Sequence, residues 1–167
     1  PSATHALAVS LEEYKSGISM VDGSEYSWKS VNSFAADQGG FVDMASTDVP
    51  CGFSNTMAMK AFKDAKGDYS KYIDVLAEHD VAVANASSWY LPSEYELSLI
   101  ASNYSLITEK LAEAGGKPFE EYKNSWDASL RSGLYWSSTY LTNQGTQSKP
   151  YILSLNQLNA TMAMHKY

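Results

Sequence analysis

Helical and strand periodicities are segregated along this chain. Apolar residues recur at helical spacing through the middle, in segments 27–40, 54–67, 68–79, 91–103 and 105–116. Alternation of apolar and polar residues, typical of a half-buried strand, marks segments 5–13, 151–156 and 161–167. Strands at both ends with helices between them predict an α+β domain whose terminal strands pair with each other.

Capping residues and glycines predict where these helices begin and end. Ser27 is placed to cap the first helix, Ser54 or Thr56 the second, and the pairs Gly39–Gly40 and Gly115–Gly116 to end the first and last. Ser93 and Glu96 have the S-x-x-E spacing of a capping box before an apolar run. The residues expected to face the core are Trp28, Val31, Phe34, Ala35, Met59, Phe62, Tyr72, Ile73, Leu76, Leu97 and Ile100.

Length and composition favour one soluble globular domain over residues 1–167. A chain of 167 residues is large enough to bury a core, and 44% apolar with 19% charged residues argues against disorder. No apolar run approaches the ~20 residues of a membrane helix, so no direct membrane insertion is expected. Because the sequence starts at Pro1 without Met, we expect a segment processed or excised from a longer chain.

The charge of the chain is unevenly distributed. All 19 acidic residues lie at or before Asp127, and residues 132–167 carry only Lys149 and Lys166 as charged side chains. An acidic protein without a basic stripe is poorly suited to contact phosphates, which argues against nucleic acid as a partner.

Motifs of catalysis and metal binding are missing from the sequence. It contains no GxGxxG, P-loop, HExxH, CxxC or GxSxG pattern, and its three histidines show no ligand spacing. The single Cys51 cannot form an internal disulfide, and burial is its expected state rather than reactivity. We therefore predict a non-enzymatic protein without cofactor or metal.

The C-terminal segment 132–167 has the composition of a recognition surface. It contains six Asn or Gln, nine Ser or Thr, and five Tyr or Trp. Tyr supplies contact area with few rotamers, while Ser and Asn supply adaptable hydrogen bonds, as in antibody paratopes. The alternative interpretation is a solvated polar sheet face, and composition by itself favours that alternative.

The order of landmarks resembles a bacterial family with a C-type-lectin-like fold. The landmarks are SWKSVNSF, GFSNTMAMKAF, SSWYLPSEYELSLI, AEAGG and GLYWSSTY, with the specificity concentrated in WYLPSEYEL and YWSST. The family includes C-terminal domains of collagen-like adhesins, surface proteins of Bacteroidetes and variable proteins of diversity-generating retroelements. The resemblance covers roughly residues 5–167.

The resemblance implies paired terminal strands, flanking helices and a long, irregular C-terminal region of strands and loops that presents the ligand-binding residues. It implies that Tyr135–Thr139, Trp89 and Leu91 are scaffold, with Trp89 and Trp136 buried, and that Pro92 makes the turn into the helix. Alternation along YILSLN puts Tyr151 on the expected apolar face, which conflicts with a binding role for it. The candidates for ligand contact are Tyr140, Asn143, Gln144, Gln147, Tyr151, Ser154, Asn156, Gln157, Asn159, Thr161 and His165.

The function implied by this family is calcium-independent binding of a protein or glycan on another cell or surface. The sugar motifs of calcium-dependent lectins, Glu-Pro-Asn or Gln-Pro-Asp with Trp-Asn-Asp, are absent. An adhesin or receptor-binding domain at the cell surface, or on a pilus or phage fibre, is the leading hypothesis. The alternatives are an assembly module of a longer surface protein and, more weakly, a relative of formylglycine-generating enzymes, which use paired cysteines.

Overall fold

The described part of the chain is a mixed domain of helices followed by strands. The computed structural model describes residues 7–11, 28–66, 87–120, 123, 133–140, 150–156 and 161–166. The helices are α1 (Trp28–Gln38), α2 (Gly52–Lys66), α4 (Glu94–Ser102) and α5 (Tyr104–Glu113), and the strands are β1 (Leu134–Tyr140), β2 (Pro150–Asn156) and β3 (Thr161–Lys166). Four of the predicted helices and both C-terminal strands are thereby confirmed, whereas the helix predicted over 68–79 lies outside the described residues.

Helix starts follow the sequence signals at α4 but not at α2. Ser93 and Glu96 form the predicted capping box at the start of α4. The prediction that Ser54 or Thr56 caps α2 is wrong, because the helix already begins at Gly52. The Ser54 hydroxyl instead accepts a hydrogen bond from the Val42 amide at 2.9 Å. The predicted cap of α1, Ser27, lies outside the described residues.

Glycines end two helices as predicted. Gly39 and Gly40 have φ of 70° and 82° after α1, and Gly115 has φ of 75° after α5. The Gly115 amide donates to the Ala112 carbonyl at 3.1 Å and the Gly116 amide to the Leu111 carbonyl at 2.8 Å. This pair of bonds is a Schellman motif, which needs a left-handed residue where glycine stands.

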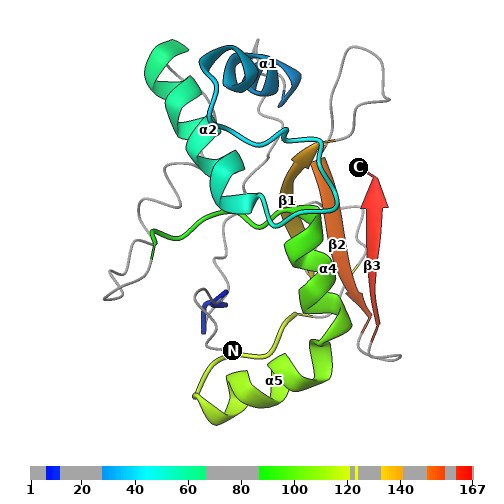
Figure 1. The fold of residues 1–167 in the computed structure, drawn as a ribbon. Helices are drawn as coiled ribbons and strands as arrows, with labels where there is room; N and C mark the ends of the chain where they lie inside the picture. The colour runs from blue at the N-terminus through cyan, green and yellow to red at the C-terminus, as the bar shows by residue number, and fades with distance from the viewer. Residues whose placement is uncertain are drawn as a thin grey trace, which may run out of the picture.

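The strands form an antiparallel sheet in the order β1-β2-β3 (Figure 1). The β2–β3 ladder is regular from Tyr151 opposite Lys166 to Asn156 opposite Thr161. The β1–β2 ladder pairs Leu134 with Ser154. Its register then shifts between Trp136 and Tyr140.

The predicted N-terminal strand is not found where the structure describes it. Residues 7–11 form no strand, and the Leu11 carbonyl accepts a hydrogen bond from the Lys117 amide at 2.8 Å. This segment is therefore tied to the chain that follows α5 rather than to β3. Leu7, Val9 and Leu11 are exposed, so these alternating apolar residues do not form a packed strand face.

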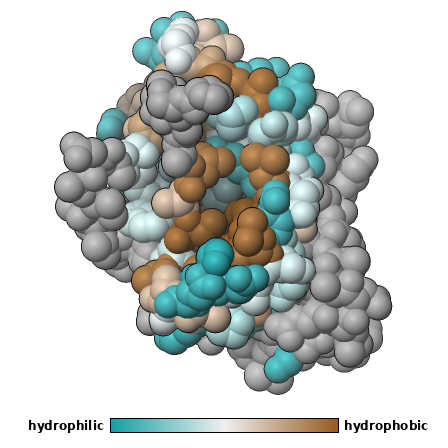
Figure 2. Space-filling view, turned by 60° about the horizontal axis from the view of Figure 1, so that its bottom comes forward, coloured by the Kyte–Doolittle hydropathy of each residue, from teal (hydrophilic) through white to brown (hydrophobic). Residues whose placement is uncertain are grey.

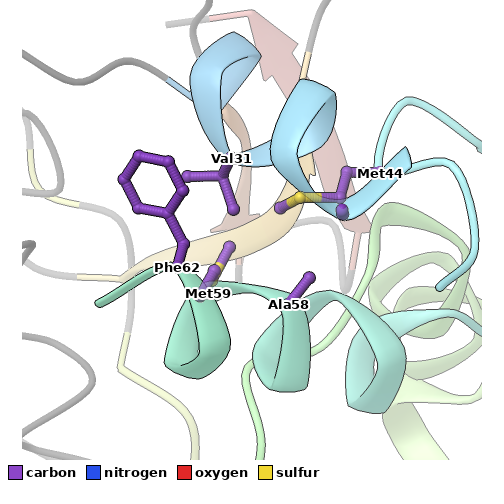
Figure 3. Packing of buried hydrophobic residues seen from close by; sticks show 6 residues of the cluster. Val31, Met44, Ala58, Met59 and Phe62 are labelled. Atoms are coloured by element: carbon purple, nitrogen blue, oxygen red, sulfur yellow. The ribbon is translucent and has the colours of Figure 1, made fainter. Parts of the chain in front are cut away.

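The main core lies between α1 and α2 (Figure 3). Val31 and Ala35 of α1 meet Met59 and Phe62 of α2, as their helical spacing predicts. Met44, from the segment joining the two helices, is fully buried in the same cluster. The Met44 amide donates to the Asn32 side chain at 2.9 Å, which holds this segment against α1.

The two faces of β1 are covered by different helices. Trp136 packs against the α1–α2 core, whereas Tyr135 packs with Ile100 of α4 and Ile107 of α5 in a second cluster. Consecutive strand residues point to opposite faces, so β1 lies between two helical layers. Helix α4 contacts all three strands, and in Figure 1 it lies beside β1 and β2.

Candidate functional site

A buried carboxylate organises the N-terminus of α4. The Glu96 Oε2 atom accepts hydrogen bonds from the Ser93 amide at 2.7 Å and from the Ser93 hydroxyl at 3.0 Å. Its Oε1 atom accepts a further bond from the Tyr90 hydroxyl at 3.1 Å. Glu96 is only 4% exposed, so these bonds replace the water that a carboxylate would otherwise bind.

The same carboxylate also serves the N-terminus of α2. The Gly52 amide donates to Glu96 Oε2 at 3.2 Å, and the Thr56 hydroxyl donates to the Gly52 carbonyl at 2.9 Å. Thr56 also accepts a bond from the Leu91 amide at 3.0 Å. Two helix N-termini, each with partial positive charge, therefore share one negative charge.

The YWSST segment of β1 is hydrogen-bonded to the N-terminal ends of α2 and α4. The Ser138 amide donates to the Pro92 carbonyl at 2.7 Å, and the Glu94 amide donates to the Thr139 hydroxyl at 2.9 Å. The Asn55 side-chain amide of α2 donates to the Ser138 hydroxyl at 3.1 Å. We call this set of buried residues the polar junction; its members are Gly52, Asn55, Thr56, Ser93, Glu96, Ser137, Ser138 and Thr139.

Burial controls the electrostatics around the polar junction. Burial raises the pKa of the Cys51 thiol, and hydrogen bonds from Asn55 and Ser93 lower it in part. Burial also raises the pKa of Tyr90, with the charge of Glu96 and the bond donated to it as further causes. Glu94 has its pKa raised by burial alone. Cys51 is 1% exposed, which confirms its predicted burial.

The hydroxyl groups of the polar junction are buried. Ser93, Ser137, Ser138 and Thr139 are fully buried, and each of their hydroxyls has a hydrogen-bond partner within the protein. The scaffold role expected for this part of YWSST agrees with this burial. Trp89 and Trp136, predicted to be buried, are only partly buried, as is common for a side chain of this size, and Trp136 packs against the α1–α2 core.

Sequence reasoning missed several members of the polar junction. Gly52 and Asn55 carried no predicted role, although Asn55 precedes buried Met59 and Phe62 by four and seven positions. That helical spacing is a signal that Asn55 faces the core. Its partner in β1 lies 83 residues away and leaves no local signal.

The register brings four of the predicted ligand-contact residues together. Residues directly opposite in a ladder share a face, and alternate residues follow on the same side. Asn156 lies opposite Thr161, Ser154 opposite Ala163, and Ile152 opposite His165. We call this side of the β2–β3 ladder the polar face; it carries Ser154, Asn156, Thr161 and His165, together with Ile152 and Ala163.

The remaining candidates are not gathered there. Tyr151 lies opposite Lys166 and alternates to the other side, together with Leu153 and Leu155. Tyr140 pairs with Pro150 beyond the register shift in β1. The others lie outside the described residues; they are Asn143, Gln144, Gln147, Gln157 and Asn159.

The surface carries apolar side chains as well. Phe53 is 43% exposed and makes an edge-to-face contact with Tyr90 at 5.9 Å between ring centroids. Figure 2 shows one face on which hydrophobic side chains gather around a hollow. None of the described helices has the length and apolar character needed to cross a membrane. Among the residues that the structure describes, no three His, Cys, Asp or Glu side chains group as a metal site.

Comparison of the chain with protein-family models, with curated proteins and with solved structures found no match.

Proposed function

We propose that this chain is a non-enzymatic ligand-binding domain that recognises a protein or glycan through the polar face. The observation that carries the proposal is the register, in which hydroxyl, amide and imidazole residues of β2 and β3 come to one side of the sheet. Amide and hydroxyl groups hydrogen-bond a partner while losing little side-chain entropy. A face without carboxylates also avoids a stranded charge in an interface.

The polar face extends away from the helical core. Trp136 packs against the α1–α2 core and lies opposite Ile152 in the ladder. Asn156 is four residues further along β2, a separation of about 13 Å in a strand. The end of the ladder at Asn156 and Thr161 is therefore the favoured centre of the binding site, while His165 belongs to the row nearest the core.

The setting we propose follows the same family resemblance. An adhesin or receptor-binding domain would be displayed outside the cell, on its surface, a pilus or a phage fibre. Within this proposal the chain is a candidate variable protein of a diversity-generating retroelement, in which the residues of the polar face differ between copies. The C-type-lectin-like fold itself remains part of the proposal.

A binding screen followed by matched variants tests the proposal. The domain is first screened against arrayed glycans and a panel of surface proteins, and the affinity for any hit is measured. Asn156→Ala with Thr161→Ala should weaken that affinity at least tenfold, about 1.4 kcal/mol. Ser87→Ala with Ser105→Ala, at two exposed positions outside the strands, serves as the control and should leave the affinity unchanged. Equal affinity in both double variants would rule out the polar face as the binding site.

An assembly module is the second candidate function. Within the described residues β3 pairs only with β2, so it stands at one edge of the sheet. An exposed strand edge can add a strand from another chain. In that case hydrogen exchange of the β3 amides should slow in the full-length protein relative to the isolated domain, whereas a ligand-binding domain should show equal exchange in both.

A further inference from the structure

The β1–β2 ladder changes register in its middle. Trp136 lies opposite Ile152, yet the next pair is Tyr140 opposite Pro150. Between these pairs β1 has the three residues 137–139 while β2 has only Tyr151. Strand β1 therefore holds two extra residues, one more than an ordinary β-bulge inserts.

The hydrophobic pattern cannot choose between the two registers. Side chains alternate with a period of two, so a slip by two residues returns every side chain to its own face. After such a slip Leu134 would lie opposite Asn156 rather than opposite Ser154. Each side chain would still point to the same face of the sheet as before. Something other than apolar burial must hold the bulge where it is.

The bulge is held by hydrogen bonds from outside the sheet. The Thr139 hydroxyl is bonded by the Glu94 amide of α4 at 2.9 Å, and the Ser138 hydroxyl by Asn55 of α2 at 3.1 Å. The Ser138 amide, displaced from a regular ladder, donates to the Pro92 carbonyl at 2.7 Å. Ser138 and Thr139 are both fully buried, so moving the bulge would strand their polar groups away from water.

We infer that Ser138 and Thr139 form a register lock that fixes where β2 and β3 lie along β1. A slip by two residues would carry β2, and β3 with it, by about 7 Å along β1. The lock thus positions the C-terminal strands relative to α2 and α4. The inference concerns the strand register alone and holds whether or not the polar face binds a ligand.

Engineered cysteine pairs can report the register. Because the Cys51→Ser background removes the only native thiol, two pairs are compared in it. Leu134→Cys with Ser154→Cys are opposite in the observed register, whereas Leu134→Cys with Asn156→Cys are opposite only after the slip. A disulfide needs Cα atoms about 4.4–6.8 Å apart, which favours directly opposite pairs over diagonal ones. The extent of cross-linking in a glutathione redox buffer is measured for each pair by peptide mapping.

The register lock predicts how this measurement responds to loss of the hydroxyls. With the native bulge, the 134–154 pair should cross-link at least tenfold more than the 134–156 pair. Thr139→Val with Ser138→Ala should lower this ratio at least tenfold, while Thr139→Ser, which keeps the hydroxyl, should preserve it. An unchanged ratio in the folded double variant overturns the inference. Loss of folding in both the double variant and Thr139→Val alone also overturns it, because the bonds would then support stability and not register.

Discussion

Glu96 and Gly52 are joined by a hydrogen bond of 3.2 Å although they lie 44 residues apart in the sequence. The carboxylate that completes the capping box of α4 is thus also the acceptor at the first residue of α2. This shared acceptor fixes the N-termini of the two helices against each other. The Glu96 carboxylate thus accepts hydrogen bonds from the Gly52 and Ser93 amides and from the Tyr90 hydroxyl.

Removal of the Glu96 carboxylate should destabilise the domain strongly. Glu96→Ala leaves the amides of Gly52 and Ser93 and the Tyr90 hydroxyl without this acceptor, and we expect a loss of about 2–4 kcal/mol in the free energy of unfolding. Glu96→Gln retains a carbonyl oxygen and should lose less. Urea unfolding measures both variants, and a Glu96→Gln variant as stable as the native protein would contradict a role for the shared charge.

Gly52→Ala tests the close approach of α2 to α4. An alanine Cβ at this position would meet Glu96 Oε2 and would lie 2.8 Å from the Leu91 carbonyl oxygen and 2.8 Å from the Ser93 nitrogen. Alanine normally favours a helix over glycine by about 1 kcal/mol, so a destabilisation would reverse the ordinary sign. We expect a loss of about 1–3 kcal/mol from the forced shift of backbone.

The control for this variant is Gly39→Ala, at a position where no atom lies within 4 Å of an added Cβ. Its φ of 70° leaves only the cost of a left-handed alanine, about 1–2 kcal/mol. The control should leave hydrogen exchange at the start of α4 unchanged, whereas Gly52→Ala should accelerate it. Acceleration in neither variant would show that Gly52 does not need to approach α4 closely.

Short-range features of this fold were predictable from the sequence. The capping box at Ser93 and the helix end at Gly115 depend on residues within one turn, so their signals are complete in a few positions. The hydrogen bond from Gly52 to Glu96 was not predictable, because Gly52 acts through its backbone amide and its lack of a Cβ. Neither property distinguishes it in a single sequence from any other glycine.

In the candidate site, too, local features were predictable from the sequence and long-range ones were not. Alternation placed Ser154 and Asn156 on one side of β2 and Tyr151 on the other, and the observed ladder has this arrangement. The register shift in β1 was invisible to alternation, since a pattern with period two is unchanged by two extra residues. The N-terminal alternation around Val9 was misleading, because residues 7–11 form no strand.

Alkaline pH should destabilise the domain through two groups whose pKa is raised by burial, one buried and one partly buried. Both Cys51 and Tyr90 have a pKa raised in the folded state, so each ionises more readily in the unfolded chain. Their contribution is therefore complete below the ordinary pKa values, about 8.5 for Cys and 10 for Tyr, and is lost as pH rises beyond them. Thermal melts between pH 7 and 11 should show a fall in Tm that is smaller in Cys51→Ser with Tyr90→Phe; an identical fall would contradict this assignment.

Trp136 should contribute to stability by covering the α1–α2 core. It is half-buried and packs against this cluster, so Trp136→Ala should cost about 2–3 kcal/mol, less than truncation of a fully buried ring. Leu106→Ala is the control, because Leu106 is 56% exposed and should change stability by less than about 0.5 kcal/mol. Urea unfolding measures both variants, and equal losses would remove Trp136 from the core.

Asn55 acts as a buried donor, and Asn55→Asp tests that role with little change in shape. Its side-chain nitrogen faces the Ser138 hydroxyl at 3.1 Å, the Ser138 carbonyl at 3.4 Å and the Cys51 sulfur at 3.4 Å. A carboxylate cannot donate to the Ser138 carbonyl and would bring a negative charge to a fully buried position. Asn55→Asp should therefore destabilise the domain more than Asn55→Ala at pH 7, although alanine removes more atoms.

Burial would raise the pKa of the introduced carboxyl above its unfolded value of about 3.9, so the excess loss of stability in Asn55→Asp should shrink as pH falls toward that value. Urea unfolding at pH 7 and pH 4 measures this, and a larger loss for alanine at both pH values would show that Asn55 serves to fill space rather than to donate.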